Sequence, residues 1–238
     1  MDVIAVLPML HMLRFPIGQA YVWQDGTELT LVDAGHAGAA ADIEEAVRGV
    51  GADPAGLRRI VLTHGHRDHV GAAQELADRY GAEVWAHRLD APVIRGEAPV
   101  PDPVLFDWEV PLYEVGLTVP EAPPTRVDRE LEDGDALGFG GGARVVHVPG
   151  HTDGSIAVHV PGHGVLLTGD AVAGVGRVML GVFNTDRARA VASMHRLAAL
   201  EPSVLCFGHG DPVTVDAARL LGAAAAGTTA DGTALAGE

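Results

Sequence analysis

The first part of the chain alternates between two hydrophobic periods. Short apolar runs bounded by turn residues predict strands over residues 3–7, 20–23, 28–32, 59–62 and 83–86. The polar turn 24–27 between two of these runs predicts a β-hairpin. A helical period predicts helices over 42–50 and 69–80, and the glycines that follow them, Gly51 and Gly81, are candidate C-caps. Strands that alternate with helices in this way are typical of an α/β fold.

The second half of the chain is richer in strands. Apolar runs that end near glycine or proline predict strands over residues 143–148, 155–160, 164–168 and 204–207. One helix is predicted over 188–200. From residue 223 onward the chain is mainly Ala, Gly and Thr, which favours fraying at the terminus. We therefore expect a single domain over 1–222 and a frayed or disordered tail over 223–238.

Residues 97–127 differ from the sequence on either side. They hold seven of the 15 prolines in the chain, namely Pro99, Pro101, Pro103, Pro111, Pro120, Pro123 and Pro124. A long proline-rich stretch inside a compact domain is usually functional or disordered. This one also carries an apolar group that a disordered segment would not need, formed by Phe106, Trp108, Leu112 and Tyr113. We expect an ordered lid or substrate-lining insertion, with a solvated linker or a homodimer contact as alternatives.

Composition narrows the range of partners. Thirty-two acidic residues against 16 basic ones give a formal net charge of −16, which repels phosphate backbones and disfavours nucleic-acid binding. No apolar run reaches the roughly 18 residues that a membrane span needs, and no secretory signal is evident at the N-terminus. The one cysteine, Cys206, is expected to be a small buried residue and permits no intramolecular disulfide. We expect a cytoplasmic protein with a small-molecule substrate.

Histidine and aspartate cluster directly after the strand predicted at 59–62. The sequence there is Thr63-His64-Gly65-His66-Arg67-Asp68-His69. Alternate side chains of an extended loop share a side, so His64, His66 and Asp68 can converge, and His69 opens the following helix. Imidazole nitrogens and carboxylate oxygens are ligands that suit zinc and its neighbours in the divalent series.

Further candidate ligands follow other predicted strands. His151 stands in Pro149-Gly150-His151, Asp170 in Thr168-Gly169-Asp170, and His209 in Phe207-Gly208-His209. Each lies just after the carboxyl end of a strand, where α/β proteins place their sites. A single such histidine would be unremarkable, but the whole set has the residue types and placement that a metal site requires.

These residues resemble the metallo-beta-lactamase superfamily. The run from His64 to His69 is similar to the HxHxDH signature of that family, and Leu31-Val32-Asp33-Ala34-Gly35 is similar to its first motif. His151, Asp170 and His209 match its third, fourth and fifth motifs in order and spacing. The resemblance spans roughly residues 3–213 and implies a four-layer αβ/βα sandwich of two pseudo-symmetric halves.

The resemblance also implies a role for each ligand. His64, His66 and His151 would bind one divalent ion, Asp68, His69 and His209 would bind a second, and Asp170 would bridge the two. Zinc is the expected metal, with manganese or iron as alternatives. Asp33 matches a supporting position outside the ligand set, where a carboxylate that accepts an imidazole N–H fixes the orientation of the ring.

The implied reaction is hydrolysis of an ester-type carbonyl by a metal-bridging hydroxide. Asp68 or a metal-bound water would carry the proton to the leaving group, which makes Asp68 and Asp170 the catalytic candidates. Asp170 argues against antibiotic-hydrolysing members, which lack a bridging aspartate. The sequence after His209 is too short for the glutathione-binding helical domain of glyoxalase II, whereas lactonases share the full ligand set. A thioester and a lactone both remain open as substrates.

Two other functions remain as alternatives. Sulfur dioxygenases of the superfamily resemble this motif set but use a single iron, held at positions that match His64, His151 and Asp170; Gly176-Arg177 is similar to part of their sequence. A non-catalytic or regulatory protein could also keep the fold. The complete ligand set argues against that option, because lost catalysis usually shows as lost ligands. Histidines outside the motifs, such as His195, are expected to be structural or exposed.

Overall fold

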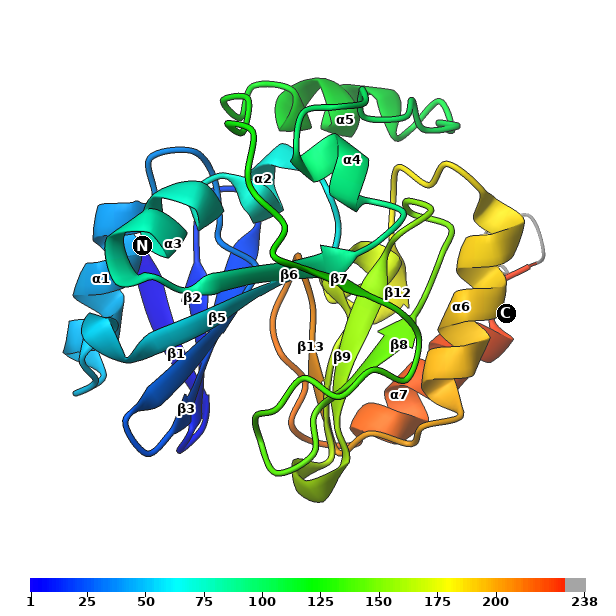
Figure 1. The fold of residues 1–238 in the computed structure, drawn as a ribbon. Coiled ribbons are helices and arrows are strands. Elements are labelled where there is room, and N and C mark those ends of the chain that lie inside the picture. Colours follow the sequence, from blue (N-terminus) through cyan, green and yellow to red (C-terminus); the bar gives the residue numbers. More distant parts are fainter. Residues whose placement is uncertain (230–238) are drawn as a thin grey trace. The chain divides into compact units, whose positions relative to one another are not determined.

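A computed structural model describes residues 1–229, which form two compact units (Figure 1). The N-terminal unit comprises Met1–Val100 and Val115–Leu131. The C-terminal unit comprises Pro101–Glu114 and the chain from Glu132 onward. The last part of the expected C-terminal tail, residues 230–238, lies outside the described residues.

One mixed sheet forms the frame of the N-terminal unit. Its strands, within the described residues, pair in the order of the sequence: β1 (Asp2–Leu7), β2 (Leu10–Arg14), β3 (Gln19–Asp25), β4 (Glu28–Val32), β5 (Leu57–Leu62), β6 (Glu83–His87) and β7 (Arg129–Leu131). β1 to β4 form an antiparallel meander, and β4 to β7 run parallel. The parallel pairs bring the carboxyl ends of β4, β5 and β6 to one edge of the sheet, where ligand sites of α/β proteins lie.

Two amphipathic helices pack on the sheet of the N-terminal unit. They are α1 (Ala40–Gly49) and α3 (Ala73–Tyr80), and the short helices η1 (Pro54–Gly56), α2 (Arg67–Val70) and α4 (Ala91–Ile94) lie in the connections. Ile43, Val47 and Leu76 point from α1 and α3 into a core shared with Leu31 and Leu62 of the strands. Each of these side chains is almost fully removed from water, which stabilises the unit by about 1.5–3 kcal/mol per side chain.

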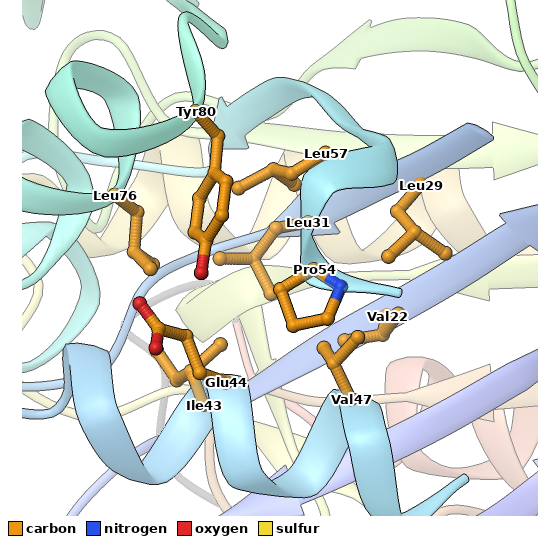
Figure 2. Close-up of a pocket in the computed structure, with 10 residues that line it drawn as sticks. All are labelled: Val22, Leu29, Leu31, Ile43, Glu44, Val47, Pro54, Leu57, Leu76 and Tyr80. Carbon is orange, nitrogen blue, oxygen red and sulfur yellow. The ribbon is translucent and has the colours of Figure 1, made fainter. Parts of the chain in front are cut away.

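A small cavity of about 10 Å³ remains in this core, between α1, α3 and the sheet (Figure 2). The cavity is about the size of a single water molecule. The carboxylate of Glu44 and the hydroxyl of Tyr80 point toward one another across it. Burial raises the pKa of Glu44, but the hydrogen bonds and charge of Arg79, together with hydrogen bonds from Tyr80 and Arg48, outweigh this effect and leave the pKa below its ordinary value.

The C-terminal unit holds a second mixed sheet. Its strands pair in the order β13 (Val204–Cys206), β10 (Val165–Leu167), β9 (Ile156–Val160) and β8 (Arg144–His147). A separate two-stranded ribbon is formed by β11 (Val172–Ala173) and β12 (Met179–Leu180), and single turns of 3₁₀ helix occur at η2 (Pro161–His163) and η3 (Gly169–Ala171). β10 and β13 run parallel, while β9 is antiparallel to both β8 and β10, so β8, β10 and β13 end at the same edge.

Helices α6 (Arg187–Ala198) and α7 (Ala217–Ala226) cover the sheet of the C-terminal unit. Met194 and Leu197 of α6 and Leu221 of α7 are fully buried and share a core with Leu205 and Phe207. Asp186 caps the N-terminus of α6, because its side chain accepts a hydrogen bond from a backbone amide in the first turn. The thiol of Cys206 is buried, as predicted.

The hydrophobic pattern placed most of the regular elements, and the structure corrects it at several points. The hairpin β3–β4 is confirmed, whereas the strand β2 was not predicted. The helix predicted over 69–80 is two helices, α2 and α3, separated at Gly71-Ala72. α7 extends to Ala226. Residues 97–127 contain a helix that was not predicted, α5 (Val110–Gly116).

Over residues 1–229, every helix is too short or too polar to cross a lipid bilayer.

The ion pair between Glu44 and Arg79 gives stability that depends on pH. Because the pKa of Glu44 lies below its ordinary value of 4.5, its charge stabilises the folded state above that pH. This contribution is lost as the pH falls through the lowered pKa. We expect Glu44→Gln to lower the melting temperature at pH 7 and the gap to the parent protein to close in acid. Thermal unfolding across this pH range, with exposed Glu45→Gln as control, tests this; an equal gap at all pH values would contradict it.

Candidate metal centre

The site in the N-terminal unit starts from two neighbouring parallel strands. Val32 at the end of β4 is paired with Val61 of β5, and Asp33 and Thr63 follow these residues by one and two positions, at the same edge of the sheet. Both are buried. The Asp33 carboxylate accepts a hydrogen bond from the backbone amide of Thr63 at 2.7 Å and another from its hydroxyl at 2.8 Å. The two strand ends are thereby locked together.

The same carboxylate orients His69. The Nδ1 of this buried ring lies 2.8 Å from Oδ2 of Asp33, and we assign it as the donor because an ionised carboxylate only accepts. The neutral ring then carries its lone pair on Nε2. Asp33 itself has a φ of +60°, a strained conformation for a residue with a side chain, of the kind that clusters at functional sites.

Thr63 links the Asp33 carboxylate to the ring of His64. Its hydroxyl hydrogen is donated to Asp33, so its oxygen can only accept from Nδ1 of His64, at 3.0 Å. The lone pair of the neutral His64 ring is therefore also on Nε2. One carboxylate thus sets the tautomer of two candidate ligands, one of them directly and the other through a hydroxyl.

The predicted ligands of the N-terminal unit converge. The ring of His64 lies 4.6 Å from that of His66 and 4.2 Å from that of His69, measured between centroids. Nε2 of His69 lies 3.5 Å from Oδ2 of Asp68. The structure therefore brings His64, His66, Asp68 and His69 together, as the sequence predicted, and places Asp33 behind them.

Two glycines allow the backbone to approach these ligands closely. A Cβ on Gly71 would lie 2.1 Å from backbone atoms of His36 and Ala37, so only glycine fits where the chain leaves α2. Gly18 has a φ of +74°, and a Cβ there would lie 3.0 Å from the carboxylate of Asp68. The helix is interrupted here because the backbone amides of Gly71 and Ala72 donate to the carbonyls of Gly35 and Ala34, at 2.8 and 3.3 Å, and not to carbonyls one turn earlier.

The site in the C-terminal unit follows from strand register. Leu167 of β10 is paired with Cys206 of β13 in a parallel ladder. Asp170 and His209 each lie three residues beyond this pair, so they reach the same edge, and Nε2 of His209 lies 3.2 Å from Oδ2 of Asp170. Gly208 donates to the carbonyl of Gly169, which holds the two loops in step. The proximity of Asp170 and His209 is therefore a direct consequence of the parallel pairing of β10 and β13.

His151 reaches the same carboxylate from the end of β8. Its Nε2 lies 3.7 Å from Oδ2 of Asp170, and its Nδ1 lies 2.9 Å from the carbonyl oxygen of Val182. A carbonyl only accepts, so Nδ1 is the donor and the neutral ring carries its lone pair on Nε2. The same loop also holds the backbone of His151, because the amide of Thr185 donates to the carbonyl of His151 at 3.2 Å.

The donor set in each unit fits a divalent cation. In the neutral rings of His69 and His151, the lone pair of Nε2 faces a carboxylate oxygen, Asp68 or Asp170, at 3.5–3.7 Å. Two facing acceptors repel one another, whereas a cation between them would bind both. Imidazole nitrogens combined with carboxylate oxygens are a donor set that suits zinc, iron or manganese.

Sequence reasoning missed the residues that hold the ligands from behind. Thr63 stands at the start of the motif, and its position alone does not indicate its role. Val182 acts through its backbone carbonyl, which no side-chain pattern can reveal. Arg67 binds the backbone carbonyls of Leu117 and Val119 at 3.3 and 3.1 Å, far along the chain. The position of Arg67 inside the motif was visible in the sequence, but its partners were not.

Known proteins resemble this chain across most of its length. The family model described as the metallo-beta-lactamase superfamily matches residues 13–209. A probable metallo-hydrolase of Bacillus subtilis, YflN, is 29% identical over 227 residues, which cover 86% of this chain and 85% of YflN. The hydroxyacylglutathione hydrolase GloC of Haemophilus influenzae is 25% identical over 198 residues, which cover 82% of this chain and 85% of GloC.

A solved structure agrees with these sequence matches. The protein TTHA1623, crystallised in a di-iron-bound form, superposes with a TM-score of 0.62 at 29% identity, over 84% of this chain and 92% of its own. The predicted α/β fold class and family are confirmed.

Asp33 is expected to control metal affinity although it is not a ligand in our assignment. Asp33→Asn keeps the size of the side chain but leaves an amide that cannot accept from both Thr63 and His69 at Oδ2. Loss of such a supporting carboxylate typically weakens metal binding by about 10–100-fold. Zinc titration against a chromophoric chelator measures this. Asp128→Asn is the matched control, because Asp128 also accepts a strand amide, that of Val84, at 2.8 Å; equal affinities for both variants would contradict the assignment.

Proposed function

Because the chain belongs to the metallo-beta-lactamase superfamily of metallo-hydrolases, we propose that it hydrolyses an ester-type carbonyl, in a thioester or a lactone. The observation that carries this proposal is the preset orientation of the candidate ligands. His64, His69 and His151 each have Nδ1 engaged by a fixed oxygen, which leaves Nε2 to bind a metal. A protein that had lost metal chemistry would have no need for this arrangement in both units.

We propose that the ligands divide as the family resemblance implies. One divalent ion would be held by His64, His66 and His151, and a second by Asp68, His69 and His209. Asp170 would be shared by the two ions. The geometry within the C-terminal unit supports this shared role, because Oδ2 of Asp170 lies 3.7 Å from Nε2 of His151 and 3.2 Å from Nε2 of His209.

Bound divalent cations would supply Lewis acidity that polarises a carbonyl and lowers the pKa of a water molecule toward neutrality. The chain's own residues would prepare that chemistry. Asp33 holds His64 and His69 in one tautomer, so no ring has to reorient during turnover. Asp68, which is half-buried beside His69, is the group that we propose moves a proton to the leaving group.

The substrate proposal rests partly on relatives. GloC is named for hydrolysis of hydroxyacylglutathione, a thioester, and it matches 82% of this chain. That similarity favours a thioester as the first substrate to test, and a lactone as the second because the same attack on a carbonyl opens its ring. For the metals we propose zinc; the di-iron form of TTHA1623 makes iron the main alternative.

Replacing the shared ligand tests the reaction class. We expect Asp170→Ala to lower kcat/KM for a hydroxyacylglutathione thioester, or for a lactone, by on the order of 100-fold or more, with loss of bound metal. His195→Ala is the control, because His195 lies exposed on α6 and should change neither quantity.

Steady-state hydrolysis and elemental analysis on the same samples provide the comparison. Full activity in Asp170→Ala with its metal retained would exclude the shared-ligand assignment. Failure of the parent protein to hydrolyse any thioester or lactone would overturn the proposed reaction class.

A further inference from the structure

Glu109 anchors the first half of the proline-rich segment inside the C-terminal unit. The residue is fully buried and forms an ion pair with Arg187 at the start of α6. Its carboxylate also accepts the backbone amides of Phe106 at 2.7 Å and Phe183 at 3.3 Å. A buried charge persists only where such partners satisfy it, so Glu109 fixes three separate segments relative to one another.

One of these segments is the loop that orients His151. Phe183 directly follows Val182, whose carbonyl receives Nδ1 of that ring, and its φ of +60° is strained for a bulky residue. The proline-rich segment reinforces the loop at a second point, because the amide of Val104 donates to the carbonyl of Asn184 at 2.9 Å. Glu109 therefore helps to hold the strained loop whose Val182 carbonyl sets the tautomer of His151.

Arg67 anchors the second half of the segment inside the N-terminal unit. It lies between the candidate ligands His66 and Asp68. Its guanidinium donates to the carbonyls of Leu117 and Val119 and forms an ion pair of 2.7 Å with Glu121. These bonds use both terminal nitrogens of the Arg67 side chain. The contacts with Leu117, Val119 and Glu121 therefore hold the turn from His66 to Asp68 in place.

We propose that residues 101–121, here called the strap, position the metal ligands, with Glu109 and Arg67 as the positioning residues. Glu109 acts on His151 through Val182, and Arg67 acts on the turn from His66 to Asp68. Order in the strap and occupancy of the metal site are then linked, and by thermodynamic reciprocity metal binding should protect the strap. This inference rests on the proposed metal-dependent function.

The strap contains its own reporter of order. It offers chymotrypsin the side chains of Phe106, Trp108, Leu112 and Tyr113, each of them exposed or half-buried. Trypsin has no site there, because the strap lacks arginine and the whole chain lacks lysine. Chymotrypsin therefore reports on the strap together with its other sites, and trypsin reports only on the rest of the fold.

The first test compares Glu109→Gln with Glu44→Gln in the full chain. Both variants neutralise a buried carboxylate paired with arginine, but Glu44 touches neither the strap nor a ligand. We expect Glu109→Gln to weaken Zn²⁺ binding by about 10–100-fold in chelator competition. Chymotrypsin should cut the strap of Glu109→Gln faster than that of the parent protein. Zinc should slow this cleavage less in the variant than in the parent. Glu44→Gln should match the parent in both measurements.

The second test uses Arg67 and stands independently if Glu109→Gln fails to fold. Arg67→Met removes the donors but keeps the apolar stem, whereas Arg67→Lys can still donate to the carbonyls and pair with Glu121. We expect Met to weaken Zn²⁺ binding and Lys to restore it in large part. A merely structural role would lower the melting temperature in both variants without this difference in affinity.

The outcomes separate this inference from the proposed function. Parent-like Zn²⁺ affinity in both Glu109→Gln and Arg67→Met would overturn the strap's role, even if the parent binds zinc and hydrolyses its substrate. A parent protein that binds no divalent metal would overturn the proposed function and this inference together. Zinc that leaves the rate of strap cleavage unchanged in the parent would also contradict the link.

Discussion

The carboxylate of Asp33 accepts hydrogen bonds from the amide and hydroxyl of Thr63 and from the ring of His69. These bonds join the ends of two parallel strands and determine which nitrogen of His64 and His69 faces the site. Buried polar groups of this kind are costly unless they are fully satisfied. Thr63 and His69 supply the partners of this carboxylate, and Asp33 adopts a strained φ of +60°.

The C-terminal unit positions its candidate ligands through different contacts. The in-register pair Leu167 and Cys206 brings Asp170 and His209 together, and a backbone carbonyl, that of Val182, orients His151. That carbonyl lies in a loop held by the buried pair of Glu109 and Arg187. A loop carbonyl is a weaker constraint than a strand end, which is a physical reason for the strap to contribute its own charge and amide contacts.

Much of the fold and most of the candidate site could be predicted from the sequence, because the patterns that indicate them are local. Strand C-termini followed by His and Asp located every candidate ligand, and the polar turn at 24–27 located the β3–β4 hairpin. β2 was missed because Pro8-Met9 is a weak turn signal between two apolar runs. The helix break at Gly71-Ala72 was missed because the partners of these two amides, the carbonyls of Gly35 and Ala34, are distant in sequence. The pairing of Glu109 with Arg187 was hidden for the same reason.

We propose that the chain holds two divalent ions through the histidines and aspartates of its two units. The most direct measurement is elemental analysis of metal per chain on protein purified without added metal, with native mass spectrometry to count ions per molecule. We expect close to two ions per chain, mainly zinc. A chain with no bound metal would contradict this proposal, and a single iron would do the same while favouring a mononuclear dioxygenase.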